Sequence, residues 1–138
     1  MLKKISLALF LIIVTASAAL AANYIEPQEL KELLNQKKPV ILVDIQPAAD
    51  FEKHHLAGSL ETNAFPAKTN EEKKRLEKVL PLIKSSNAPV VVICPRGKSG
   101  AKNSYEYLVS QGVNEDRLQI LEGGIHEWPY AELFVTGR

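Results

Sequence analysis

The chain has 138 residues, 46% of them hydrophobic and 24% charged, which fits one ordinary folded domain. Its 17 lysines and arginines against 16 aspartates and glutamates give a formal net charge of +1, and the basic residues form no long stripe, so nothing indicates nucleic-acid binding. A single cysteine excludes a disulfide framework within the chain and raises the question of what that thiol does.

Residues 1–21 have the pattern of a secretory signal peptide. Two lysines near the start precede an almost wholly apolar run, and Ala19-Leu20-Ala21 is an A-x-A cleavage site. The alternative is an uncleaved membrane anchor, because the apolar run with its alanine-rich tail approaches the roughly 20 residues that a membrane span needs. We favour cleavage, which predicts a periplasmic or secreted domain of residues 22–138 with no membrane contact.

The first half of that domain alternates between helical and extended patterns. Pro27 fits the first turn of a helix, with leucines following at helical spacing. Val40–Val43 is a continuous apolar run that ends at Asp44, which is typical of a buried parallel strand. Pro47–His54 is expected to form a short helix that turns Phe51 toward the core.

The second half continues the alternation. Thr69 and Glu72 fit a capping box that opens one long helix. Val90–Ile93 predicts a second buried strand, a helix begins at Ser99, and Leu118–Leu121 predicts a third strand. Strands that alternate with helices indicate an α/β fold with a mostly parallel sheet covered on both faces.

The only cysteine, Cys94, directly follows the second predicted strand. Ligands of open parallel sheets bind beyond the carboxyl ends of the strands, so a functional loop is expected there. That loop can turn backbone N–H groups inward ahead of a helix, and Arg96 and Lys98 add two positive charges. These features predict a Cys94 pKa below that of a free thiol. The alternative is a core thiol at the end of a buried strand. The predicted anion-binding loop consists of Pro95, Arg96, Gly97, Lys98, Ser99 and Gly100.

Two other anion-binding motifs do not fit this loop. A nucleotide-binding P-loop needs a glycine five positions before Gly97, and Val92 stands there. A loop of the tyrosine-phosphatase type carries arginine six positions after the cysteine, where this chain has Gly100. The loop therefore lacks a bidentate clamp for a phosphoryl group.

Four segments, in order along the chain, resemble the rhodanese-like sulfurtransferases. Cys94–Ala101 is similar to the active-site loop of that family, and Ile41–Ile45 resembles its first long strand with an acidic end. Phe51–Pro66 resembles the histidine–glycine segment, and Leu121–Trp128 the ending that runs from a double glycine to tryptophan.

The resemblance implies a rhodanese-like α/β fold, with a five-stranded, mainly parallel sheet and helices on both faces. It also implies an enzyme like thiosulfate sulfurtransferase. The Cys94 thiolate would take the outer sulfur of an anionic donor such as thiosulfate, and the resulting persulfide would pass it to a thiol or to cyanide. Asp44 would support the loop, and neither a metal nor an organic cofactor is needed.

The sequence departs from the family at Gln46, where arginine is usual, at Pro95, which removes one amide donor, and at Ser99, where arginine or threonine is common. Two other functions stay open. The domain could be a non-catalytic sulfur carrier that docks another exported protein, or the thiolate could act on an oxyanion such as arsenate or phosphate. His54 and His55 are interpreted as structural or surface residues rather than metal ligands.

Overall fold

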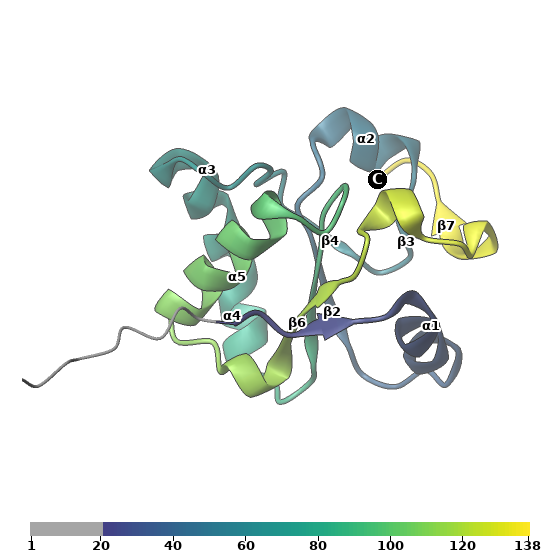
Figure 1. Cartoon of the computed structure of the whole chain (residues 1–138), viewed down its shortest axis with the longest axis horizontal. Coiled ribbons are helices and arrows are strands. Elements are labelled where there is room, and N and C mark those ends of the chain that lie inside the picture. Colours follow the sequence, from purple (N-terminus) through teal and green to yellow (C-terminus); the bar gives the residue numbers. More distant parts are fainter. Residues whose placement is uncertain (1–20) are drawn as a thin grey trace, which may run out of the picture.

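A computed structural model describes residues 21–138 of the chain (Figure 1). The predicted signal peptide, apart from Ala21, lies outside the described residues, so its cleavage stays a prediction. Within residues 21–138, no helix is both long and apolar enough to cross a membrane.

Five strands form one sheet in the order β1-β6-β5-β2-β4, and every neighbouring pair is parallel (Figure 1). They are β1 (Tyr24–Ile25), β2 (Ile41–Asp44), β4 (Leu60–Glu61), β5 (Val90–Ile93) and β6 (Leu118–Leu121). A separate antiparallel pair joins β3 (His55–Leu56) to β7 (Phe134–Val135). The predicted five-stranded parallel sheet is confirmed, and β5 is its middle strand, so Cys94 leaves the sheet at the centre of its carboxyl edge.

Helices cover both faces of the sheet, as predicted. The α3, α4 and α5 helices lie on one side, α1 and the β3-β7 pair lie on the other, and α2 is at the top of the view (Figure 1). The α-helices are α1 (Pro27–Asn35), α2 (Ala48–Lys53), α3 (Asn70–Lys74), α4 (Leu80–Lys84) and α5 (Ser99–Ser110). Short 3-10 helices occupy Arg75–Val79, Glu115–Arg117, Ile125–Glu127 and Ala131–Leu133.

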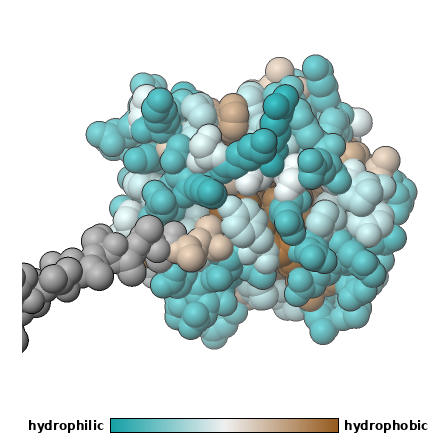
Figure 2. Space-filling model, viewed as in Figure 1, coloured by the Kyte–Doolittle hydropathy of each residue, from teal (hydrophilic) through white to brown (hydrophobic). Residues whose placement is uncertain are grey.

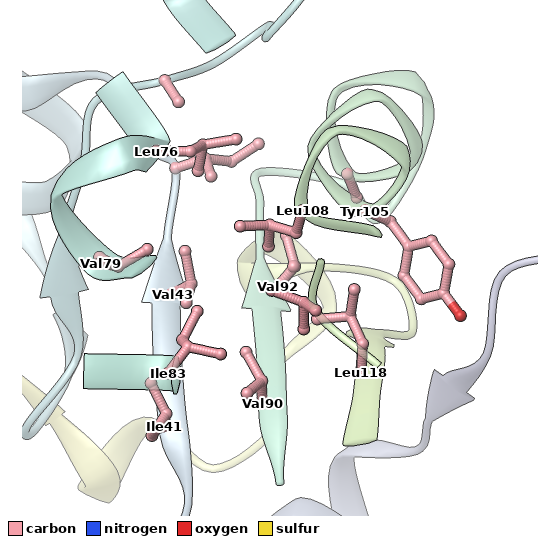
Figure 3. Packing of buried hydrophobic residues seen from close by; sticks show 14 of the residues in the cluster. Ile41, Val43, Leu76, Val79, Ile83, Val90, Val92, Tyr105, Leu108 and Leu118 are labelled. Carbon is pink, nitrogen blue, oxygen red and sulfur yellow. The ribbon is translucent and has the colours of Figure 1, made fainter. Parts of the chain in front are cut away.

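The pleat of the strands sorts their side chains into two apolar clusters, one on each face. Val90, Val92 and Cys94 belong to the cluster beneath α4 and α5, whereas Val91 and Ile93 belong to the cluster beneath α1. Figure 3 shows the first cluster, in which residues of the helices and the 3-10 segment meet those of the strands. Most of the surface seen in Figure 2 is hydrophilic, and apolar residues appear mainly in a narrow recess near its middle.

The long helix predicted to start at Thr69 is wrong in its length. The capping box is present, since the Glu72 N–H donates to Thr69 Oγ1 at 3.1 Å and the Thr69 N–H donates to Glu72 Oε1 at 3.0 Å. The segment then divides into α3, a 3-10 helix and α4. Pro81 has no N–H to donate to the carbonyl four residues before it. The chain preceding it forms a tighter 3-10 helix, in which the Leu80 N–H donates to Glu77 O.

Candidate active site

Cys94 lies where β5 gives way to the loop before α5, and its side chain is buried, with 1% of its surface exposed. The Gly97 N–H donates to Sγ, with 2.7 Å between nitrogen and sulfur. The backbone N–H groups of Arg96, Lys98 and Ala101 also favour the thiolate. The loop therefore surrounds the sulfur with inward-facing amides, as the sequence predicted.

The prediction of a lowered thiol pKa is wrong. Burial raises the pKa of Cys94 above its ordinary value, and this desolvation outweighs the opposing amides, of which that of Gly97 contributes most. Arg96 and Lys98 are exposed to solvent. Their charges are therefore screened by water, and they favour the buried thiolate less than the sequence suggested.

The raised pKa predicts how the thiol reacts with an alkylating reagent. We expect the rate constant for modification of Cys94 by iodoacetamide to rise about tenfold per pH unit between pH 7 and 8.5, because only the thiolate reacts. Intact-mass measurement gives an unambiguous readout, since the chain has a single cysteine. A rate that is already constant over this interval would mean that the amides outweigh burial.

A pocket of about 210 Å³ opens beside the thiol. Its lining residues are Phe65, Cys94, Pro95, Arg96, Lys98, Ser99 and Gly100. All the predicted loop residues except Gly97 line this pocket, and Gly97 contributes through its N–H to the sulfur. The lining includes two cationic side chains and no carboxylate. The site is thus suited to a small anion that approaches a sulfur nucleophile.

The double glycine after β6 packs directly against the cysteine loop. The Ile125 N–H donates to Cys94 O at 2.8 Å, and the His126 N–H donates to Pro95 O at 3.0 Å. A methyl group on Gly124 would lie 2.5 Å from Cys94 O and 2.6 Å from the Arg96 nitrogen. Gly124 also has a φ of +64°, which side-chain-bearing residues rarely adopt. Only glycine therefore allows the backbone of this segment to approach the loop so closely.

Two residues of the site were missed as functional candidates at the sequence level. Gly124 shapes the loop from outside, and Phe65, from the segment after β4, forms a wall of the pocket. A double glycine ahead of a helical segment is a usable signal for a close backbone approach. Nothing local marks Phe65, because its place depends on how its segment packs against α5.

Asp44 lies at the carboxyl end of β2, paired in register with Ile93, and is fully buried. It does not line the pocket. Its Oδ1 accepts from the Gln46 N–H at 2.8 Å and its Oδ2 from Gln46 Nε2 at 2.9 Å. Gln46 thus hydrogen-bonds the carboxylate in place of the arginine usual in the family, but it brings no compensating charge.

The buried carboxyl of Asp44 has a raised pKa. Burial raises the pKa of its carboxyl from 3.8 to about 6, against the lowering effects of the two Gln46 hydrogen bonds. The folded state therefore keeps the Asp44 carboxyl protonated up to about pH 6, whereas in the unfolded chain this carboxyl loses its proton near pH 4. The contribution of Asp44 to stability consequently falls as pH rises from about 4 to about 6 and stays constant above that.

The direction of this pH dependence gives a testable prediction for the variant Asp44→Asn, whose side chain cannot ionise. Relative to the variant, wild-type protein is expected to lose about 2 kcal/mol of unfolding free energy between pH 4.5 and 7. Urea unfolding of both proteins across this range measures the difference and cancels the contributions of other titrating groups. A constant difference would show that Asp44 is ionised throughout.

The adjacent histidines both pack against aromatic rings. His55 is buried and stacks on Phe51 with ring centroids 3.8 Å apart, and its Nδ1 lies 2.9 Å from Phe51 O. The ring of His54 packs against Phe134 at 4.4 Å. Among residues 21–138, no group of three histidine, cysteine or acidic side chains is placed to hold a metal ion.

The described chain thus combines a parallel sheet with a cysteine, surrounded by backbone amides, at the carboxyl end of the middle strand. The family model of the rhodanese-like domain matches residues 26–131, and the chain therefore belongs to the rhodanese-like family. No curated protein sequence matches the chain.

Solved structures of the same fold have different activities. The chain is similar to a Saccharomyces cerevisiae homologue of single-domain rhodanese and the Cdc25 phosphatase catalytic domain (TM-score 0.64, 18% identity, 85% of this chain and 89% of that one). It is similar to a Pseudomonas aeruginosa thiosulfate sulfurtransferase (TM-score 0.62, 20% identity, 85% of this chain and 20% of that one). It is also similar to an As-Sb reductase from Leishmania major (TM-score 0.62, 20% identity, 84% of this chain and 86% of that one). At these identities the likeness shows a common fold alone.

Proposed function

We propose that this protein is a sulfurtransferase that moves sulfane sulfur from an anionic donor such as thiosulfate to a thiol or to cyanide through a persulfide on Cys94. The observation that carries the proposal is the buried Cys94 sulfur, which accepts the Gly97 N–H at the floor of a pocket with two cations and no carboxylate in its lining. Membership of the rhodanese-like family supports it.

Besides solvent, the reaction requires only Cys94, the backbone amides of its loop, the sulfur donor and the acceptor. The thiol first gives its proton to solvent, and the thiolate then attacks the outer sulfur of thiosulfate. A bond forms between Cys94 Sγ and that sulfur, the sulfur–sulfur bond of the donor breaks, and its electron pair leaves with sulfite. The negative charge then rests on the outer persulfide sulfur, where backbone amides of the loop can stabilise it. Cyanide or a thiolate removes that sulfur as thiocyanate or as a new persulfide, and Cys94 returns as thiolate.

The charges of the loop tip serve donor binding in this proposal. Arg96 and Lys98 are exposed at the pocket, so they attract a dianion mainly at long range and with strong salt dependence. Pro95, Ser99 and Gly100 shape the walls. Asp44 acts on the pocket indirectly. Its backbone carbonyl accepts hydrogen bonds from both the N–H and the hydroxyl of Thr62, which lies in the segment that leads to Phe65.

Oxyanion chemistry is the weaker candidate. Related folds include a yeast protein tyrosine phosphatase of the rhodanese family and an As-Sb reductase. In this chain the sixth position after the cysteine is Gly100, which packs against Phe65 and offers no guanidinium to a phosphoryl group.

We also propose that the domain acts outside the cytoplasm after removal of residues 1–21. The signal-like sequence of that segment supports this, and an uncleaved anchor is the alternative.

The test is the intact mass of the reduced protein after incubation with thiosulfate. We expect a gain of one sulfur atom, which cyanide removes with release of thiocyanate over repeated cycles. Protein alkylated beforehand at its single cysteine is the matched control and gains nothing. A sulfur gain without turnover to small acceptors would favour a carrier that docks a partner. No gain by a folded protein whose thiol alkylates normally would overturn the proposal.

A further inference from the structure

The segment Phe134–Arg138, which we call the C-terminal strap, lies beyond the part of the chain that the family model matches, since that match ends at residue 131. The first two residues of the strap form β7, which pairs with β3 in antiparallel orientation. The Gly137 N–H then donates to Glu52 O, in α2, at 2.8 Å, so the end of the chain runs beside α2 (Figure 1). The strap thus connects β3 and α2, and its last residue reaches β4.

The strap ends in an ion pair with Glu61, the last residue of β4. Arg138 Nε lies 3.0 Å from Glu61 Oε1 and 3.1 Å from Oε2, so both carboxylate oxygens share this donor. Burial raises the pKa of Glu61, but hydrogen bonds from Asn63 and Arg138, together with the charges of Arg138 and Lys78, outweigh it and hold that pKa below its ordinary value. Glu61 is therefore ionised at neutral pH, as the pairing with Arg138 requires.

The same carboxylate fixes the bend that follows β4. Glu61 Oε1 also accepts from Asn63 Nδ2 at 3.2 Å. Asn63 has a φ of +56°, in the left-handed region, which asparagine adopts more readily than most residues. Arg75 Nη1 donates to Asn63 O at 2.9 Å. The bend is thus held at its side chain through Glu61 and at its carbonyl through Arg75.

The bend leads directly to Phe65, the aromatic wall of the pocket beside the thiol. Only Ala64, which is fully buried, separates Asn63 from Phe65. The Phe65 N–H donates to Ile45 O at 2.8 Å, which ties the wall to the end of β2. A methyl group on Gly100 would lie 2.9 Å from Cδ2 of Phe65, so the ring contacts the cysteine loop. A change in the backbone at the bend is therefore carried to the wall of the pocket.

We propose that Arg138 is a positioning residue of the Cys94 site. Through Glu61 and Asn63 it fixes the bend that places Phe65 against the cysteine loop, and it thereby keeps the pocket in the shape that binds the sulfur donor. The role in donor binding rests on the proposed function, whereas the fixing of the bend does not. The ion pair is exposed, with 56% of the Arg138 side chain accessible, so it adds little to global stability and its effect is local.

Amide hydrogen exchange tests the fixing of the bend. The N–H groups of Thr62 and Phe65 donate to backbone carbonyls at the end of β2, so their exchange reports how often the segment after β4 opens. We expect Arg138→Gln to speed exchange at these two amides about threefold, the effect of losing one exposed ion pair, and to leave the amides of β5 unchanged. Arg138→Lys keeps the charge and should recover most of the wild-type protection.

Two further variants isolate the ion pair. Glu132→Gln is the matched control, because it removes another exposed ion pair close to the strap, the one with Lys31 at 3.8 Å, and should change exchange at neither amide. Glu61→Gln removes the same pair as Arg138→Gln from the other side. The double variant of Glu61 and Arg138 should therefore exchange no faster than either single variant.

Turnover of thiosulfate with cyanide tests the consequence for the reaction. We expect Arg138→Gln to raise KM about threefold and to leave kcat unchanged, because the variant loosens a wall of the pocket and not the nucleophile or its amides. If no donor loads Cys94 in wild type, the proposed function fails, and hydrogen exchange alone decides the role of Arg138. Equal exchange at Thr62 and Phe65 in wild type and variant, faster exchange throughout the domain or in Glu132→Gln, or an unchanged KM for a donor that loads would overturn the inference.

Discussion

Replacing Cys94 by alanine is expected to abolish sulfur loading and to lower turnover of thiosulfate to thiocyanate at least about a thousandfold, as loss of a catalytic nucleophile does. No second thiol can substitute, because the chain has one cysteine. The described lining of the pocket also contains no other nucleophile of comparable strength, since Ser99 has only a hydroxyl. The measurement is intact mass after thiosulfate treatment, followed by a cyanide assay.

The same substitution should leave the fold intact, so the loss can be assigned to chemistry. Alanine removes only the sulfur of a buried side chain and costs about 1 kcal/mol by lost transfer and a small cavity. Thermal unfolding of both proteins measures that cost. A Cys94→Ala protein that still takes up sulfur would rule out a persulfide at this position, and one that does not fold would require the same assay on Cys94→Ser.

The centre of the fold could be predicted because its signals are local. The strand β5 is continuous and apolar, β2 is apolar up to Asp44, and β6 is apolar except for Gln119, since these strands are largely buried on both faces. The helix start at Thr69 is specified by two residues of a capping box. The outer strands of the sheet could not be predicted from the sequence. Two-residue elements such as β1 and β4 have no period to detect, and only their pairing with a neighbour defines them.

At the site, the nucleophile and its loop could be found from position in the chain, but the energetics could not. Charges at Arg96 and Lys98 and a helix start suggested a lowered thiol pKa, and burial of Cys94 by the surrounding core reversed that direction. The burial of a side chain depends on the tertiary structure and cannot be read from a short stretch of sequence. The same reason applies to Phe65, whose place beside the thiol depends on contacts with β2 and α5.

The contact of the double glycine with the loop leads to the second large prediction. Gly124→Ala is expected to cost about 4 kcal/mol of folding stability, the sum of strain at positive φ and overlap with backbone atoms of the loop. Backbone atoms cannot rotate away as the end of a flexible side chain can. Urea unfolding measures the cost, which is a large fraction of the stability of an ordinary domain.

Gly112→Ala separates the two causes. Gly112 also has a positive φ, +94°, but nothing lies within 4 Å of an added methyl group, so this variant should cost only about 1 kcal/mol and load sulfur normally. Gly124→Ala should lose sulfur loading more than about tenfold even where it is folded. Its methyl group meets the Arg96 nitrogen, and a displaced Arg96 N–H no longer supports the thiolate. Equal costs for both variants would mean that the loop yields to the methyl group, and the geometry of the amides around Cys94 would then be maintained by α5 rather than by the double glycine.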